Sequence, residues 1–513
     1  MDNISNSLSL PVVMIALIIC LLIFHPLYNL YLHPLRHYPG PRLHAAFHFS
    51  YALTYLSGRS NAVMHNLHER YGPILRVAPN ILSYTDSDAY RDIRGHRKQG
   101  TGQNPTDVEG FFFMQRQTLL GMDREGHARV RKVLANGFSA KSMQEQEPVI
   151  RQHVDLFISK LKDIATSQHE DNLGTLDIVS WFNFVIFDLI GALSFGESLG
   201  CLEHSRLHPW VQAVFDATNM YGKRMMVKWY SPSSILTAWI GWIIGLSAPH
   251  SKQQDFAARK VEKRLAMEDP ASRMDFVDAM YRAEFEGEDG LKKVLREEIV
   301  FNMRLIMLAG SESTATALTG TVFLLATHGD VQRRLAGDVR GLFEREGEID
   351  IWSAQRVKYL GAVLSEAMRV LPPASLSMPR FCQEGGDVIC GRWVPAGVTL
   401  EIWPMAVTHS SRNFAKPDEF IPERWMDDGE RDPIFENDKA EALKPFSYGP
   451  RDCIGKSLAN VEMRLILARM LWNFDISLAD EKGKTWAKDM LGWNLWLKYP
   501  LNVVLTPVRR GKK

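Results

Sequence analysis

A cysteine near the carboxyl end of the chain has the most informative neighbours. Cys453 lies in the decapeptide FSYGPRDCIG, residues 446–455, with a glycine on each side and an arginine two residues before it. Apolar residues then follow at helical spacing: Leu458, Val461, Leu465, Ala468 and Trp472. A thiol at a helix start lies near unpaired N–H groups and the positive end of the helix dipole, and both favour the thiolate. A thiolate with no second cysteine nearby is suited to hold a metal ion or attack a substrate.

The residues around Cys453 decide between these interpretations, because a lone cysteine is more often a small buried apolar side chain. Together they form the pattern Phe-x-x-Gly-x-Arg-x-Cys-x-Gly, and in every one of these positions the chain resembles the haem-ligand loop of the cytochrome P450 family. The resemblance implies that Cys453 is the axial ligand of the iron of haem b. It also implies a cofactor-binding loop shaped by Phe446, Gly449, Arg451 and Gly455.

The same stretch is a near match to a phosphate-binding loop, through Gly449 and the sequence Gly455-Lys456-Ser457. Five residues separate the two glycines, where the phosphate motif needs four. The sequence therefore gives little support to a phosphate site.

The stretch 297–328 predicts a long helix that is apolar on most faces. Its middle reads AGSEST, residues 309–314, and Gly310 there would let a flat ligand approach or let the helix kink. The serine and threonine hydroxyls of this segment either donate hydrogen bonds to backbone carbonyls one turn earlier, which is common in helices, or have a functional role. The segment is similar to the oxygen-activation motif of the family, with Ser313 in the usual threonine position. The resemblance implies that Glu312, Ser313 and Thr314 relay protons.

A second helix is predicted from Val357 to Leu371, where two prolines end it. Glu366 and Arg369 lie three residues apart on the face opposite its apolar stripe, and such a pair is usually a solvated surface ion pair. The pair also resembles the Glu-x-x-Arg helix of the family. The resemblance implies a buried network completed by Arg424 of a Pro-Glu-Arg segment, which supports folding and positions the haem loop.

Four basic residues are similar to those that hold the haem propionates in the family. His127 and Arg131 have the His-x-x-x-Arg spacing, Arg380 follows the helix stop, and Arg451 lies in the cysteine loop. The resemblance implies that all four donate hydrogen bonds to the propionates, and charge strengthens such bonds.

Composition excludes several classes of function. The 513 residues contain 60 Lys and Arg against 59 Asp and Glu, so the net charge of +1 gives no sign of a nucleic-acid partner. The five cysteines form no CxxC pair, which argues against a disulfide framework and a zinc site.

The amino-terminal residues predict a membrane anchor over residues 1–32, followed by a proline-rich rigid spacer at 33–41. Residues 8–24 carry no charge, although they are slightly short for a membrane span and Pro26 would kink a longer helix. Arg36 and Arg42 follow the span, so we expect a single-pass protein of the endoplasmic reticulum with its catalytic domain in the cytosol. A cleaved signal peptide is disfavoured, because this stretch has no basic region before it and no cleavage site of small residues after it. A buried core helix is also disfavoured, because the stretch lies at the start of the chain.

The remainder, residues 33–513, is expected to form one haem-binding catalytic domain. Helical spacing at 150–161 and 181–193, with turn signals between short apolar runs at 374–402, predicts a mainly α protein with a minor β-sheet. The resemblance, closest to the fungal membrane-bound branch, implies the cytochrome P450 fold.

The family resemblance implies a monooxygenase that hydroxylates or epoxidises a lipophilic small molecule of fungal secondary metabolism, using O2. We find no dinucleotide fingerprint, so electrons are expected from an NADPH-cytochrome P450 reductase, and Lys444, Arg451 and Lys456 give the Cys453 side a basic character suited to an acidic partner. The run Phe111-Phe112-Phe113-Met114 favours a lipophilic pocket, or a core cluster. The alternatives are a reductase-free rearrangement or dehydration at the same cofactor, and a haem-binding sensor or carrier without turnover.

Overall fold

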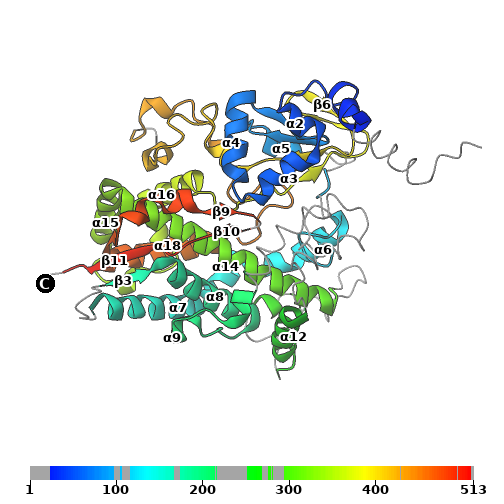
Figure 1. Ribbon diagram of the computed structural model, residues 1–513. Coiled ribbons are helices and arrows are strands. Elements are labelled where there is room, and N and C mark those ends of the chain that lie inside the picture. The colour runs from blue at the N-terminus through cyan, green and yellow to red at the C-terminus, as the bar shows by residue number, and fades with distance from the viewer. Residues whose placement is uncertain are drawn as a thin grey trace, which may run out of the picture.

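The computed structural model describes residues 23–96, 104–106, 116–166, 174–213, 215, 251–267, 275–278, 280, 294–427, 429–493 and 495–509, with the backbone alone for 251–255. A helical part carries most of the chain, and a smaller part rich in strands lies above it in Figure 1. The prediction of a mainly α fold with minor sheets is confirmed.

The helical part is built around α14 (Arg296–Thr327), which crosses the molecule and packs against α8 (Ile178–Phe195), α16 (Lys358–Val370) and α18 (Lys456–Asn473) (Figure 1). The helices predicted at 297–328 and 357–371 are thereby confirmed. The other helices of this part are α6 (Arg124–Leu134), α7 (Ala140–Thr166), α9 (Cys201–His204), α12 (Ser251–Leu265), α15 (Gly329–Leu342) and α19 (Trp486–Asp489).

Helix α8 shows how the local sequence sets these boundaries. The Asp177 carboxylate accepts hydrogen bonds from the N–H groups of Val179 and Ser180, and Gly196 ends the helix in the left-handed conformation at a φ of 71°. Nearly every side chain between these ends is buried. Among the described residues, α8 is the one helix long and apolar enough to cross a membrane, and its burial makes it a core helix.

The strand-rich part holds a four-stranded sheet in the order β1 (Ile74–Ala78), β2 (Ile81–Tyr84), β7 (Thr399–Glu401), β4 (Arg380–Phe381). Strands β2 and β7 are parallel and the other neighbours are antiparallel. Beside this sheet, β5 (Asp387–Ile389) and β6 (Arg392–Val394) form a separate hairpin. The strands expected at 374–402 are present, but the expectation of one sheet made from them is wrong, because β4 and β7 belong to a sheet that continues through the distant β2, while β5 and β6 pair separately.

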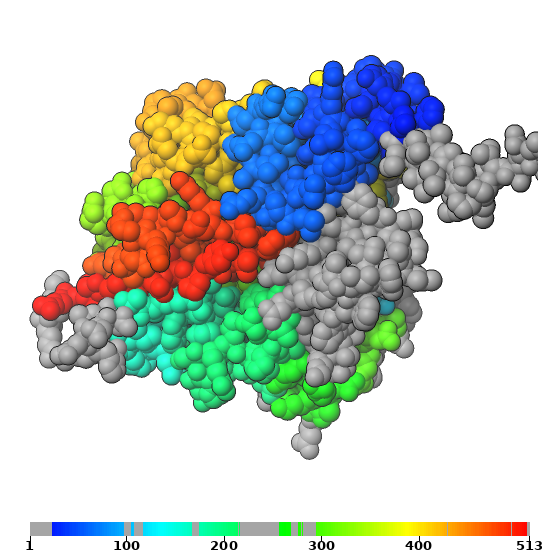
Figure 2. All heavy atoms as spheres, viewed as in Figure 1, coloured from blue at the N-terminus to red at the C-terminus, as the bar shows by residue number. Residues whose placement is uncertain are grey.

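Two further sheets accompany the helices. One has the order β3 (Thr175–Asp177), β11 (Asn502–Pro507), β8 (Phe474–Leu478), and the other pairs β9 (Leu491–Gly492) with β10 (Trp496–Leu497). Figure 2 shows these carboxyl-terminal segments (red) between the amino-terminal part (blue) and the helices α7 and α8 (teal).

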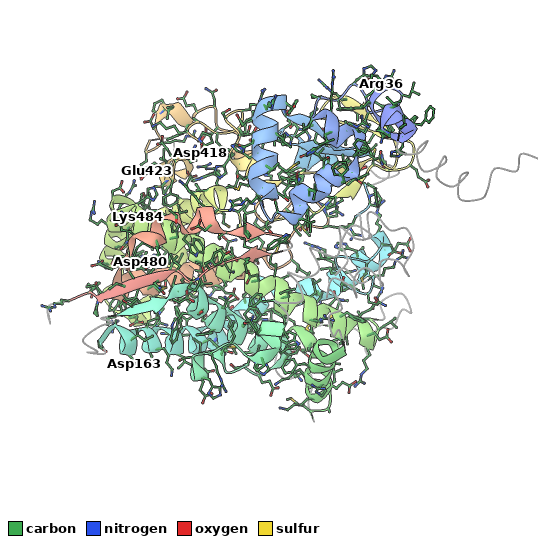
Figure 3. The ribbon with its side chains drawn as sticks, viewed as in Figure 1. Arg36, Asp163, Asp418, Glu423, Asp480 and Lys484 are labelled. Carbon is green, nitrogen blue, oxygen red and sulfur yellow. The ribbon has the colours of Figure 1, made fainter. Side chains whose placement is uncertain are left out.

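Short helices connect these elements. The α-helices are α2 (Arg42–Ala46), α3 (His48–Leu56), α4 (Ser60–Tyr71), α5 (Ala89–Arg94) and α17 (Pro404–Thr408). The 3₁₀ helices are η1 (Ala135–Phe138), η3 (Glu346–Glu348), η4 (Ser353–Arg356), η5 (Pro422–Trp425), η6 (Pro433–Phe435), η7 (Ala440–Ala442) and η8 (Glu481–Thr485). Charged side chains such as those of Arg36, Asp163 and Lys484 lie at the periphery (Figure 3).

The proline-rich segment 33–41 packs onto the strand-rich part, so the expectation of a spacer is wrong. Leu35 is fully buried, and the carbonyl of Pro39 accepts the N–H of Arg76 on β1 at 2.8 Å. The preceding helical residues 23–31 are also attached, because the Asn29 side chain donates to the carbonyl of Ala46 at 2.9 Å. Most of the predicted anchor, residues 1–22, lies outside the described residues.

Candidate functional site

The loop 446–455 folds back on itself before α18 begins. The N–H of Cys453 donates to the carbonyl of Phe446 at 2.9 Å, and the N–H of Asp452 donates to the carbonyl of Gly449 at 3.0 Å. Gly455 is the residue that precedes the first turn of α18, and a Cβ placed on it would lie 3.9 Å from the Cys453 sulfur. The loop therefore presents the sulfur at a helix start, as the sequence predicts.

Cys453 is exposed, whereas Cys201 and Cys382 are buried. The protein atoms packed around the loop nevertheless raise the pKa of the Cys453 thiol, and a hydrogen bond from the backbone of Gly455 opposes this. The N–H at the helix start thus favours the thiolate as expected, but burial of the loop among the protein atoms outweighs it. Exposure is the better guide to ligand access, and the sulfur is open to a cation whose binding would remove the thiol proton.

Arginines gather on one side of this loop. Arg94, Arg380 and Arg451 line a cavity of about 1190 Å³. Each has a buried nitrogen without a hydrogen-bond partner: Nε of Arg94, Nε of Arg380 and Nη1 of Arg451. Burial, together with the positive charges of Arg94 and Arg451, lowers the pKa of Arg380 to about 9. Neighbouring arginines with buried nitrogens that lack partners fit a ligand that brings several carboxylate oxygens, as the two propionates of haem do.

His127 lies within the same cluster. Burial, with the charges of Arg451, Arg131 and Arg380, lowers the pKa of His127 to about 3. The imidazole is therefore neutral at physiological pH, and it would donate an uncharged hydrogen bond to a carboxylate. Arg94, which the sequence analysis did not single out, belongs to this cluster as well. It is the last residue of α5, a short helix with the sequence AYRDIR that matches no recognisable motif.

Arg131 contacts the cysteine loop itself. Its Nη1 donates to the Asp452 carbonyl at 2.6 Å and its Nη2 to the Asp452 carboxylate at 2.5 Å. Arg451 likewise uses one nitrogen to bind the carbonyls of Met122 and Asp123, at 2.8 and 2.9 Å. Both residues attach the loop to the α6 region, which fixes the position of Cys453.

The acid and hydroxyl residues of α14 point in different directions. Glu312 and Thr314 are buried, whereas Ser313 is exposed and donates to the carbonyl of Ala309 at 2.6 Å. No hydrogen bond joins the Glu312 and Ser313 side chains, both of which the structure describes. The space beside Gly310 is covered by Ile190 of α8, 3.5 Å from where a Cβ would stand.

The Glu312 carboxylate has a partner that no sequence motif predicts. Lys498, which follows β10, donates to Oε1 of Glu312 at 2.5 Å and to Oγ1 of Thr316 at 2.7 Å. Burial raises the pKa of Glu312, and the charge of Lys498 opposes this rise. A lysine 186 residues away in the sequence has no spacing signal that could have identified it.

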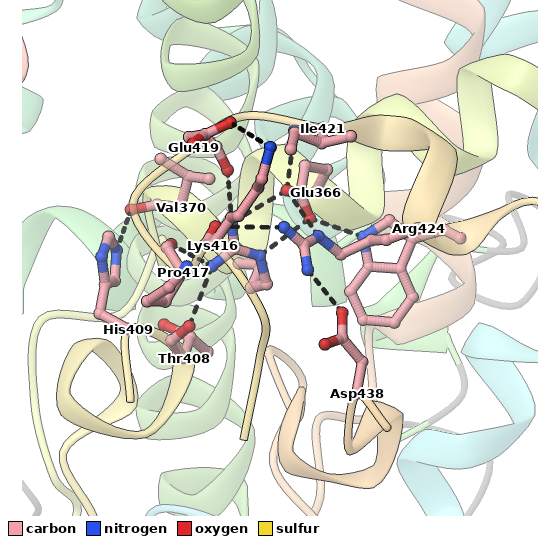
Figure 4. Close-up of polar contacts among 12 residues, drawn as sticks. Glu366, Val370, Thr408, His409, Lys416, Pro417, Glu419, Ile421, Arg424 and Asp438 are labelled. Carbon is pink, nitrogen blue, oxygen red and sulfur yellow. Dashed lines mark hydrogen bonds and ion pairs between the residues drawn. The ribbon is translucent and has the colours of Figure 1, made fainter. Parts of the chain in front are cut away.

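Glu366, Arg369 and Arg424 form a network whose members are almost wholly buried (Figure 4). Arg369 binds both oxygens of Glu366 at 2.9 Å, and Nε of Arg424 binds Oε1 at 3.0 Å. The carboxylate also accepts the N–H of Ile421 and the indole N–H of Trp425. The surface interpretation of this pair is wrong, because the segment 408–438 covers that face of α16.

The same network ties down the segment that leads to the cysteine loop. Arg369 donates to the carbonyls of Thr408, Pro417 and Glu419, and Arg424 donates to the Asp438 carboxylate at 2.5 Å. The run at residues 111–114 lies outside the described residues, so the lipophilic pocket stays a prediction.

Comparisons with known proteins agree with this geometry. The family model described as Cytochrome P450 matches residues 39–500. An averantin hydroxylase of Dothistroma septosporum is 38% identical over 94% of this chain and 88% of its own length. A trichothecene C-15 hydroxylase of Fusarium sporotrichioides is 37% identical over 94% of both chains. A cytochrome P450 monooxygenase of Aspergillus oryzae, aclL, is 38% identical over 94% of this chain and 95% of its own.

Proposed function

Because the chain belongs to the cytochrome P450 family and is a monooxygenase that binds haem b, we propose that it hydroxylates or epoxidises a lipophilic small molecule of secondary metabolism, with Cys453 as the axial ligand of the iron. The observation that carries the proposal is the group of arginines whose buried nitrogens lack hydrogen-bond partners, together with an exposed cysteine on the loop that holds Arg451. These residues match the cofactor at both its charged edge and its metal. The relatives named hydroxylases support the reaction class.

The cofactor is held by residues with separate tasks. Arg380, Arg451 and His127 would donate to the propionates, and Arg94 adds a further donor. Phe446, Gly449 and Gly455 shape the loop that presents the sulfur, while Arg131 fixes the loop through Asp452. When bound, thiolate-ligated haem supplies the oxygen-insertion chemistry, and the protein orients the substrate and excludes water.

The acid and hydroxyl residues of α14 would handle protons. Glu312 is buried and ionisable, and Ser313 and Thr314 carry hydroxyls that both donate and accept hydrogen bonds. Ser313 can rotate away from the Ala309 carbonyl more freely than threonine, because it lacks the methyl group that restricts χ1. We assign these three residues to proton transfer and Glu366, Arg369 and Arg424 to folding and loop positioning.

Electrons would come from an NADPH-cytochrome P450 reductase on the same membrane. The exposed Lys456 at the start of α18 and the nearby Lys444 give the Cys453 side a basic surface. Membrane attachment through residues 1–32, with residues 33–513 as the cytosolic catalytic domain, is supported by exposed apolar side chains at the end of that segment and on α3: Phe24, Tyr31, Leu32 and Leu53. Such a patch at the start of the chain suits the membrane of the endoplasmic reticulum.

The test of this function is reconstitution with the reductase. Purified enzyme, reductase, NADPH and extracts of candidate lipophilic compounds should give oxygenated products, and deletion of the gene should leave the unoxidised precursor in the cell. Product formation without NADPH would instead indicate a rearrangement or dehydration, and the absence of any product in both experiments would indicate a carrier.

A further inference from the structure

The buried ion pair between Lys498 and Glu312 joins two segments that are far apart in the sequence. Their side chains are only 5% and 4% exposed. Lys498 also donates to Thr316, which bonds back to the carbonyl of Glu312 at 2.8 Å. Glu312 is therefore held at two points, through its carboxylate and through its own backbone.

One oxygen of the Glu312 carboxylate has no hydrogen-bond partner. Oε1 of Glu312 accepts from Lys498 at 2.5 Å, whereas the buried Oε2 has no hydrogen-bond partner. A buried carboxylate oxygen without a donor is costly, so such an atom in a folded protein calls for a reason. Proton exchange is such a reason, because a carboxylate oxygen that accepts no other bond is free to take up a proton.

The segment that carries Lys498 is itself fixed on both sides. The indole N–H of Trp496 donates to the carbonyl of Pro372 at 2.9 Å, and the N–H of Leu501 donates to the Asp177 carboxylate that caps α8 at 3.0 Å. Figure 1 shows β9 and β10 beside α14. The lysine is therefore held in place by the fold, with little freedom to leave Glu312.

Lys498 is the one charged group among the described residues that shifts the pKa of Glu312. Charged residues on the other elements packed against α14 have partners of their own: Asp188 on α8, Arg264 on α12, Arg340 on α15, Glu366 and Arg369 on α16, and Asp475 on β8. Glu462 on α18 is buried as well, but it adds nothing to the pKa of Glu312. Burial is the largest cause of the raised pKa of Glu312, and among the charged groups of the described residues Lys498 alone opposes it.

We propose that Lys498 is a positioning residue for proton transfer, which fixes Oε1 of Glu312 and leaves Oε2 as the oxygen that takes up a proton and passes it on. This rests on the proposed function of Glu312. The proton comes from solvent and leaves again from the same oxygen, so the carboxylate is restored after each transfer. A purely structural ion pair would also need the charge of the lysine, but it would not need an Oε2 without a hydrogen-bond partner.

The first test uses stability, which does not require turnover. The raised pKa of Glu312 makes the folded state bind more protons than the unfolded chain, so the contribution of Glu312 to stability falls as pH rises above its unfolded pKa. Lys498→Met raises that pKa further. The drop in midpoint unfolding temperature between about pH 5 and pH 8 should therefore be larger in Lys498→Met than in the wild type, and close to wild type in Lys498→Arg.

The double variant separates charge from packing. In a Glu312→Gln background, Lys498→Met should add no pH dependence, because the titrating group is gone. Equal pH dependence in the wild type and in Lys498→Met would overturn the proposal. So would a pH effect of the lysine substitution that persists in the Glu312→Gln background.

The second test uses the ratio of product to peroxide in the reconstituted enzyme. Lys498→Met should lower this ratio by roughly tenfold or more and move its pH profile to higher pH, and Lys498→Arg should restore both. A folded Lys498→Met enzyme with an unchanged ratio and profile would contradict the proposal. If the wild-type enzyme forms no product with NADPH, the proposed function fails instead, and the unfolding comparison still decides the role of Lys498.

Discussion

Gly449 lies directly against the backbone of Arg94. Its φ is 84°, and a Cβ on it would stand 1.9 Å from the Arg94 carbonyl oxygen. The cysteine loop is thereby joined to α5, whose last residue also donates to the hydroxyl of Ser447 at 3.0 Å. A glycine is required at position 449 for two reasons: its φ is positive, and a side chain would clash with the Arg94 carbonyl. This explains why the motif that presents the cysteine ligand contains a glycine there.

Gly449→Ala should lower the free energy of unfolding by more than about 2 kcal/mol and reduce the haem content of the purified protein. Gly391→Ala is the matched control, because Gly391 has a φ of 74° and nothing within 4 Å of its Cβ position. It should lose about 1–2 kcal/mol from backbone strain alone and keep its haem. Equal effects of the two substitutions, measured by denaturant unfolding and haem absorbance, would show that the contact with Arg94 is unimportant.

Glu366→Gln should destabilise the fold by roughly 3–5 kcal/mol, because it leaves Arg369 and Arg424 buried without their shared carboxylate. Denaturant unfolding measures the change. Lys358→Ala on the same helix α16 removes an exposed ion pair with Asp427 and should have no measurable effect. A loss as small as that of the control would contradict the structural role of the network.

Arg380→Gln should weaken haem retention by about tenfold or more, because one charge-assisted hydrogen bond to a propionate contributes about 1.5–3 kcal/mol. Transfer of haem to an apo-acceptor protein measures the loss. Arg380 is a cleaner probe than Arg451, which also binds the carbonyls of Met122 and Asp123. The exposed Arg412 provides the control, Arg412→Gln. Haem loss from the Arg380 variant at the rate of the control would remove Arg380 from the cofactor site.

Ser313→Ala should increase peroxide release relative to product by about tenfold, since it removes the exposed hydroxyl of the α14 segment. Thr319→Val serves as the control, because Thr319 makes the same back-bond, to Ala315 at 2.7 Å, further along the helix. An unchanged ratio of peroxide to product in the Ser313 variant would contradict a role of Ser313 in proton transfer and leave Thr314 as the candidate hydroxyl.

The sequence predicts those parts of the fold that local spacing determines. Helices α14 and α16 and the cysteine loop could be identified because hydrophobic periodicity and fixed motifs act over short distances. Strands β1 and β2 escaped notice, since their residues are all buried and show no alternation. The pairing of β2 with β7 depends on contacts over more than three hundred residues, which no local pattern encodes.

The residues of the candidate site likewise fall into those that local motifs predict and those that only tertiary packing brings to the site. Cys453, Arg380 and the Glu366 network lie in recognisable motifs, and the structure brings the network together as the sequence predicts. Arg94 and Lys498 lie in none, because each reaches its site through tertiary packing. The upward shift in the pKa of Cys453 also depends on packing, which the position of a residue at a helix start cannot reveal.

The most direct measurement is the absorption spectrum of the reduced carbon monoxide complex, recorded for the wild-type protein and for Cys453→Ala, both loaded with haem. The thiolate-type band should be present in the wild type and lost in the variant, while Cys382→Ala, which alters a buried cysteine, keeps it. A thiolate-type band that survives in Cys453→Ala, or a wild-type spectrum typical of nitrogen ligation, would contradict the assignment of Cys453.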